Sequence, residues 1–300
     1  MYSNAHSYYS LRYGILSPEE LIDIFLDFNF DYCLLTDINN TSACLDFTRM
    51  AQLKKIKPIV GIDFRNSNEQ LYIGIAKNNE GFQELNDHLS EHLHAKKDFE
   101  RIAPCFENVF VVYPFSSYPK NLQLKKNEYI GIKPKELIRL ELSKSSIPKP
   151  KLLCLQSASF RNKTDFNTHR LLRAIDKNLL LSTLEIKDQG REEDLFLDQD
   201  KLKNLYAAHP YILENTGALL SKCSLHFSFN DVAQNHNQSC YTASKEEDFK
   251  LMKKICSENL SYRYPKAGEA VFARMKKELE IIKEKNFVSY FLINWDILKY

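Results

Sequence analysis

The side chains best suited to chemistry lie at the predicted ends of the first three strands. His6 follows the opening segment, Asp37 comes at the end of the apolar run DYCLLTD, and Asp63 lies in GIDF. In parallel α/β barrels, functional residues gather at the carboxyl ends of the strands. One imidazole and two carboxylates there could bind a divalent ion. Three such groups among apolar neighbours are equally typical of satisfied polar side chains at a barrel mouth, and we favour that interpretation.

Alternating strands and helices would position these side chains. LSPEELIDIFLDF predicts a helix with Ser17 as N-cap, Pro18 at its first position and Glu20 completing a capping box. Further helices are predicted around residues 47–53, 82–93, 134–142 and 164–175. Buried strands are predicted at DYCLLTD, KPIVGIDF, QLYIGIA, NVFVVYP, NEYIGI and KPKLLCLQS. This repetition predicts an α/β fold with a closed or nearly closed parallel barrel.

A second region is predicted near the C-terminal end. The sequence turns polar and irregular from Phe227 to Ser244, so we place a boundary between residues 235 and 236. Ser244 and Glu247 predict another capped helix, and a further apolar periodicity predicts a second one. The closing segment NFVSYFLINWDILKY is apolar and uncapped, and we therefore expect more protein to cover it.

Composition argues against several classes of protein. There are 41 basic and 39 acidic residues, so the surface as a whole does not indicate a polyanionic partner. The seven cysteines form no CxxC pair, which is typical of reduced thiols. The N-terminus lacks a signal-peptide pattern, and no apolar run approaches the roughly 18 residues that span a membrane. We expect a cytoplasmic protein.

Several blocks together resemble one family. NAHSYYSLRYG, LLTDINNTS, KPIVGIDF, IAKNNEGFQELN, ILENTGALLSKC and ELEIIKEKNFVSYFLINWDILKY occur in the order and spacing of the bacterial DNA polymerase III alpha subunit. The resemblance covers essentially the whole chain. It implies a polymerase and histidinol phosphatase (PHP) domain over residues 1–235, which is a distorted (βα)7 TIM-like barrel. Residues 236–300 would be a helical linker and the truncated beginning of the polymerase palm.

Intact PHP domains bind several metal ions for phosphoester hydrolysis, and the resemblance implies that most of their ligands are lost here. His6, Asp37 and Asp63 remain in ligand positions. Ligands are replaced at Asn4, Tyr13, Ile38, Leu71, Phe115, Ser157 and Ser159. A hydrolytic cluster needs anionic and imidazole ligands to hold its cations together. We therefore predict no metal cofactor and no PHP hydrolase activity in this chain.

The resemblance also implies what the longer protein does. It would be a DNA-directed DNA polymerase, a nucleotidyltransferase of DNA replication that uses Mg²⁺. Its catalytic carboxylates would lie beyond residue 300, since Asp296 belongs to the opening helix of the palm. Its partners would be DNA and, by family precedent, a proofreading exonuclease subunit and a sliding clamp, with no membrane. No residue of this chain is predicted to be catalytic, and its DNA-binding residues are not identified.

Weaker signals admit plainer interpretations. His88 and His92 are four residues apart, as in zinc sites, but the segment lacks the glutamate of a zincin, and we predict solvent-exposed histidines. We interpret His169 as a structural residue away from the metal site. Tyr8, Tyr9 and Tyr13 could stack on bases, but we expect them to pack over the altered site. The alternatives to a polymerase fragment are an active stand-alone PHP phosphoesterase, which the lost ligands oppose, and a structural adaptor, which the palm-like segment opposes.

Overall fold

The chain is described by a computed structural model that covers residues 2–119, 123–143, 147–229 and 240–299. These residues cluster into two compact units, residues 1–229 and 230–300. The boundary predicted between residues 235 and 236 lies outside the described residues. Each unit is considered by itself below.

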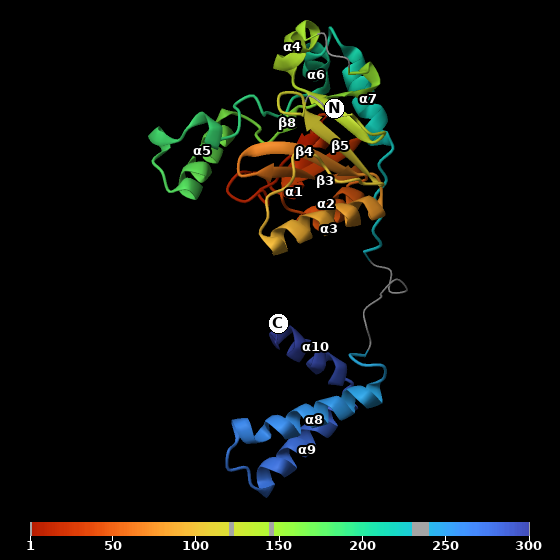
Figure 1. Cartoon of the computed structure of the whole chain (residues 1–300), viewed down its shortest axis with the longest axis vertical. Coiled ribbons are helices and arrows are strands. Elements are labelled where there is room, and N and C mark those ends of the chain that lie inside the picture. Colours follow the sequence, from red (N-terminus) through yellow and green to blue (C-terminus); the bar gives the residue numbers. More distant parts are fainter. Residues whose placement is uncertain (1, 120–122, 144–146, 230–239, 300) are drawn as a thin grey trace. The chain divides into compact units, whose positions relative to one another are not determined.

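The first unit is a mixed α/β structure (Figure 1). Its strands are β1 (Asn4–Ala5), β2 (Tyr32–Ile38), β3 (Lys57–Asn66), β4 (Glu69–Ala76), β5 (Val109–Pro114), β6 (Glu128–Ile132), β7 (Leu152–Cys154) and β8 (Ser157–Ala158). Its helices are α1 (Pro18–Asp27), α2 (Cys44–Leu53), α3 (Asn79–Ala95), α4 (Leu137–Leu142), α5 (Lys163–Lys177), α6 (Gln199–Leu205) and α7 (Pro210–Ser221). Short 3-10 turns cover Pro134–Glu136, Lys149–Lys151, Leu181–Thr183 and Ile186–Asp188.

The first helix is specified by local signals. Ser17 Oγ accepts a hydrogen bond from Glu20 N, and the Glu20 carboxylate accepts one from Ser17 N. The backbone N–H groups of Ser17 and Glu20 would otherwise have no hydrogen-bond partner within the helix. Leu21, Ile22 and Phe25 are buried on the inner face of α1. The predicted capping box and helix are therefore confirmed.

The central sheet has six strands in the order β2-β3-β4-β5-β6-β7. The ladders of β2 with β3, β5 with β6 and β6 with β7 are parallel, whereas β4 is antiparallel to both neighbours. The predicted all-parallel arrangement is wrong at this strand. Only Ser67 and Asn68 separate β3 from β4, and Ser67 has φ of 53°. A parallel connection needs about a dozen residues or more, so this short link requires a hairpin.

The two short strands β1 and β8 form a separate parallel pair beside β2. Side chains make several of the connections around them. Thr36 Oγ1 accepts from Ala5 N at 2.8 Å and donates to Asn4 Oδ1 at 2.8 Å. Ser3 Oγ donates to the carbonyl oxygen of Cys154 in β7 at 2.6 Å. The strand predicted as one piece at KPKLLCLQS is thus divided between β7 and β8, and a mixed α/β fold is confirmed without a regular count of seven units.

The second unit consists of α8 (Lys245–Arg263), α9 (Glu269–Glu284) and α10 (Val288–Lys299). Ser244 Oγ caps α8 by accepting from Glu247 N. Its small core comprises Phe249, Met252, Leu279, Val288 and Leu292. Asp248 is fully buried and accepts hydrogen bonds from Thr242 and from Ser289 Oγ.

None of the described helices is long and apolar enough to span a lipid bilayer.

Candidate functional site

Five of the retained and replaced ligand positions, Asn4, His6, Asp63, Ser157 and Ser159, meet where β1, β3 and β8 come together. Asn4 in β1 lies opposite Ser157 in β8. Asn4 Nδ2 donates to Ser157 Oγ at 3.1 Å and to Asp63 Oδ2 at 3.2 Å. His6 follows β1, is fully buried, and reaches Ser159 Oγ through Nδ1 at 2.8 Å. The structure therefore brings these positions together as polar partners of one another.

Asp63 lies in the middle of this group, within β3 rather than at its end as predicted. The side chain is fully buried. Its Oδ2 atom accepts hydrogen bonds from Asn4 Nδ2, His6 Nε2, Arg65 Nε and Nη2, and Gln70 Nε2. Its Oδ1 atom is buried without a hydrogen-bond partner among the described residues. Since a carboxylate only accepts, the His6 ring must donate from Nε2 to Asp63.

Arg65 supplies a positive charge directly to Asp63. Their closest contact, from Arg65 Nη2 to Asp63 Oδ2, is 2.6 Å, and the Arg65 side chain is only 9% exposed. Burial alone would raise the pKa of Asp63, but Arg65 and His6 outweigh it and hold this pKa below its usual range. Asp63 is therefore a carboxylate anion paired with a cation that belongs to the chain.

Asp37 is satisfied separately by the segment that follows β1. Its Oδ1 accepts from Ser7 N and Ser10 Oγ, and its Oδ2 accepts from Ser7 Oγ, each at 2.7 Å. Burial raises the pKa of Asp37, and the hydrogen bonds from Ser10 and Ser7 oppose that rise. This carboxylate holds the turn of residues 7–10 against β2.

Tyr13 covers the group, as predicted, whereas Tyr8 is 46% exposed and stacks on Tyr9. The centroid of the Tyr13 ring lies 5.4 Å from the centroid of the His6 ring. It lies 4.9 Å from Cζ of Arg65. His169 supports Tyr13 from behind, donating from Nδ1 to the Tyr13 carbonyl at 2.7 Å and accepting from Gly190 N at Nε2. His169 is structural, but it lies against the site through Tyr13 rather than away from it, which corrects that prediction.

The other replaced positions are apolar. Ile38 is the last residue of β2 and is partly buried. Leu71 in β4 is 6% exposed, as is Phe115 just after β5. The Phe115 ring stacks on Tyr118. None of these three side chains offers an atom that binds a metal ion.

These residues do not fit a metal cluster. His6 uses both ring nitrogens, Asp37 uses both oxygens, and only Asp63 Oδ1 is free. A cluster needs several anionic ligands that converge on its ions. Within the described parts of the chain, only one group of three His, Cys, Asp or Glu side chains brings ligand atoms within 4.8 Å of one another, and it is His88, His92 and Glu100. His6, Asp37 and Asp63 do not form such a group.

A cavity of about 250 Å³ opens beside Arg65. It is lined in part by Tyr13, Arg65, Gln70, Lys133 and Asp194. Burial lowers the pKa of Lys133, and it raises the pKa of Asp194, while each charge opposes the shift of the other. The cavity is therefore polar, and its walls carry three basic side chains (Arg65, Lys133 and Arg191) and two acidic ones (Glu69 and Asp194).

His88 and His92 contradict the prediction of solvent-exposed histidines. They are 9% and 8% exposed, on the side of α3 that faces the sheet. Tyr72 of β4 reaches His88 Nε2 at 2.9 Å, and Phe99 stacks on the His92 ring at 4.8 Å. The prediction failed because Phe99, which covers the helix, comes from an irregular segment without a clear sequence signal.

Sequence reasoning also missed the residues that satisfy the carboxylates. Arg65 follows Asp63 by two positions in a strand, and side chains two apart point to the same face, so this pair could have been found. Ser7 and Ser10 lie in a turn, and Gln70 reaches Asp63 across the hairpin. No local pattern indicates these three contacts.

The chain matches two known protein families and is similar to several known proteins. Residues 3–118 match the PHP domain, and residues 250–300 match a family described as the bacterial DNA polymerase III alpha NTPase domain. The chain is 26% identical to DNA polymerase III subunit alpha of Ureaplasma parvum, an alignment that covers 99% of this chain and 28% of the relative. The corresponding protein of Mycoplasma genitalium is 24% identical, with 100% and 35% covered. That of Halalkalibacterium halodurans is 22% identical, with 99% and 29% covered.

The chain thus spans about a third or less of the length of these relatives. The predicted resemblance is confirmed: along essentially its whole length the chain is similar to bacterial DNA polymerase III alpha subunits, and its residues 3–118 match the PHP domain.

Proposed function

We propose that this chain is the N-terminal region of a cytoplasmic DNA-directed DNA polymerase that acts in DNA replication. In this proposal the first unit is a PHP domain that binds no metal at its ancestral site and serves as a structural support or docking platform. Supporting it are the relatives, which are DNA polymerase III alpha subunits, and the chemistry of the altered site.

The contact between Arg65 and Asp63 carries the argument about the site. A metal ion would compensate the negative charge of Asp63, and the guanidinium already does so at 2.6 Å. Placing a divalent ion on Asp63 Oδ2 would require displacing the donors of His6, Asn4 and Arg65. It would also bring the ion close to a buried positive charge, which is strongly unfavourable where the dielectric constant is low. The internal cation explains how the carboxylate persists after the loss of metal ligands.

Hydrolysis of a phosphodiester tests the inactive PHP site. We expect the chain, assayed with Mn²⁺ or Zn²⁺ on a generic phosphodiester, to turn over no faster than the variant His6→Gln/Asp63→Asn. Metal content after purification should also be unchanged by these two substitutions. Turnover that depends on His6 and Asp63 would instead support the alternative of an active PHP phosphoesterase.

Primer extension tests the polymerase assignment. The 300-residue chain should not extend a primer, because its proposed catalytic carboxylates lie in the rest of the polypeptide. The protein encoded by the full gene should extend primers in the presence of Mg²⁺ and lose this activity when Mg²⁺ is chelated. A full gene product that cannot extend a primer would refute the assignment.

The docking role concerns a proofreading exonuclease subunit or a sliding clamp. Co-elution of the full-length protein with each candidate in gel filtration, with and without residues 1–229, measures whether the first unit contributes. Equal co-elution with and without that unit would restrict its role to structural support.

A further inference from the structure

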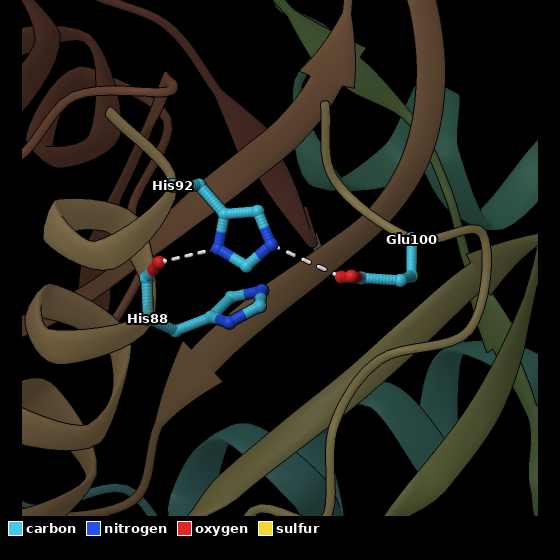
Figure 2. Close-up of side chains that lie close together, drawn as sticks. All are labelled: His88, His92 and Glu100. Carbon is cyan, nitrogen blue, oxygen red and sulfur yellow. Dashed lines mark hydrogen bonds and ion pairs between the residues drawn. The ribbon is translucent and has the colours of Figure 1, made fainter. Parts of the chain in front are cut away.

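His88 and His92 of α3 form a compact group with Glu100 of the segment that follows the helix (Figure 2). The two histidines are separated by one helical turn, so their rings lie on the same side of α3 with centroids 4.4 Å apart. Glu100 comes from the irregular segment after the helix, and its carboxylate points toward His92. One ligand atom from each of the three residues lies within 4.8 Å of the others.

The hydrogen bonds of His92 indicate that a cation lies between its Nε2 atom and the Glu100 carboxylate. His92 Nδ1 lies 2.9 Å from the carbonyl oxygen of His88, so Nδ1 must carry a hydrogen. In the neutral ring, Nε2 is then a lone pair, and it faces Glu100 Oε2 at 3.1 Å. Two acceptors cannot form a hydrogen bond with each other. Either a proton or a metal ion must lie between them.

A metal ion would contact more of these side chains than a proton would. A proton on His92 would satisfy the contact with Glu100 alone, whereas a divalent ion could also bind His88. Two imidazoles and one carboxylate are the protein ligands of known zinc sites that keep one position for water. The bond from His92 Nδ1 to a backbone carbonyl orients the ring in the manner typical of metal-bound histidine.

The surroundings of the group fix its geometry. Phe99 stacks on His92, and Asn66 accepts from Phe99 N at 2.9 Å and donates to Phe99 O at 2.8 Å. The Tyr72 hydroxyl lies 2.9 Å from His88 Nε2. If the metal takes that nitrogen, the hydroxyl becomes free to donate to a metal-bound water. Glu100 is 69% exposed, which leaves a path for the ion to enter from solvent.

This group is distinct from the altered PHP site. Phe64, the residue between Asp63 and Arg65 in β3, packs against His88 with centroids 5.3 Å apart. Asp63 therefore contacts His6 and Arg65 on one face of the strand while Phe64 contacts His88 on the other. The two sites use opposite faces of the same hairpin and share no residue.

We propose that His88, His92 and Glu100 bind one divalent transition-metal ion of the Zn²⁺ type, with water at the remaining position. The ion fastens the segment after α3 to the helix and is structural. This site does not depend on the polymerase assignment.

Metal titration of the untagged 300-residue chain tests the proposal. After treatment with a chelator and its removal, Zn²⁺ is added in competition with a chromophoric chelator. The chain should bind one equivalent, and Co²⁺ in its place should give the visible absorption of a low-coordinate site with nitrogen ligands. Glu100→Gln and His92→Gln should each weaken binding at least about tenfold, the lower end of the losses seen even for residues behind metal ligands.

Matched controls separate this site from others. His94→Gln, at an exposed position on the same helix, and His6→Gln, at the altered PHP site, should leave the affinity unchanged. Because Glu100 is exposed, Glu100→Gln should keep the fold even if His92→Gln does not, and circular dichroism checks both. Failure of the wild-type chain to compete for Zn²⁺, or equal binding by Glu100→Gln, would overturn the proposal. Loss of binding in His6→Gln alone would instead place the metal at the PHP site and overturn both proposals.

Discussion

Buried polar groups are compensated in different ways on the two faces of the β3–β4 hairpin. On one face, Asp63 is compensated by Arg65 and by neutral donors, so its charge is balanced within the chain. On the other face, His92 Nε2 faces Glu100 Oε2 at 3.1 Å, and a proton or a metal ion must lie between them. Under the proposed function, the loss of a metal site involves more than the loss of its ligands. The remaining carboxylates must acquire new donors, or they become costly buried charges.

The largest expected effect comes from removing the internal cation. Arg65→Ala leaves Asp63 buried and without its ion pair, and breaking such a pair typically lowers the free energy of unfolding by about 3–5 kcal/mol. Urea denaturation monitored by circular dichroism measures the loss. Arg101→Ala removes an arginine whose side chain is 65% exposed and paired with Glu69, and should lose less than about 1 kcal/mol. Equal losses in the two variants would contradict the role given to Arg65.

The double variant Asp63→Asn/Arg65→Gln tests the same ion pair by removing both of its charges. It removes both charges while keeping polar atoms near the His6, Asn4 and Gln70 side chains. We expect it to be more stable than Arg65→Ala alone, because the unpaired charge is gone. A double-mutant cycle with the two single variants, measured in urea, gives the coupling energy. A coupling near zero would show that the contact is incidental.

The next effect is a pH dependence at His169, which supports the wall of the first face. Burial, reinforced by Arg173 and opposed by the bond to the Tyr13 carbonyl, lowers the pKa of His169 from 6.5 to about 4. The folded state therefore binds the proton less well than the unfolded state, and stability falls as the pH drops below 6.5. Linkage predicts a loss of about 2 kcal/mol between pH 7 and pH 5.

This pH dependence can be separated from that of other groups. His169→Gln should be less stable at pH 7 but should lose correspondingly less on going to pH 5. His94→Gln, the exposed control, should keep the slope of the parent chain. Parallel curves for the parent chain and His169→Gln would rule out the buried neutral ring as the source.

The smallest effect is expected on the second face without metal. Glu100→Gln should change the free energy of unfolding of the metal-free chain by less than about 1 kcal/mol, because Glu100 is largely exposed. With Zn²⁺ present, the parent chain should gain stability and the variant should not. Thermal melting with and without Zn²⁺ measures both. A large loss in the metal-free variant would mean that the pair is already a strong salt bridge.

The sequence predicted those features that depend on neighbouring residues. The cap at Ser17 and the burial of β2 and β3 follow from local residue types, and the structure confirms them. The alternation of strands and helices gave the fold class. The antiparallel direction of β4 was missed, although the two-residue link at Ser67 and Asn68 contained the information.

The sites were less accessible to sequence reasoning because their partners come from distant segments. The structure brings His6 and Asp63 together with Asn4, Ser157 and Ser159, as the resemblance implied. The donors to Asp37 and Asp63 come mainly from outside the expected ligand positions. The burial of His88 and His92 depends on Tyr72 and Phe99, and helical spacing alone cannot reveal it.

Asp248 links two of the three helices in the second unit, α8 and α10. The carboxylate joins the turn before α8 to Ser289 at the beginning of α10, across a core of only five buried apolar side chains. Burial would raise its pKa, but bonds from Ser289 and Thr242 outweigh it and hold the pKa at about 2. These bonds therefore stabilise the folded unit at neutral pH and are lost as the pH falls below about 4. Acid would thus loosen the ends of α8 and α10 together, as one cooperative opening event.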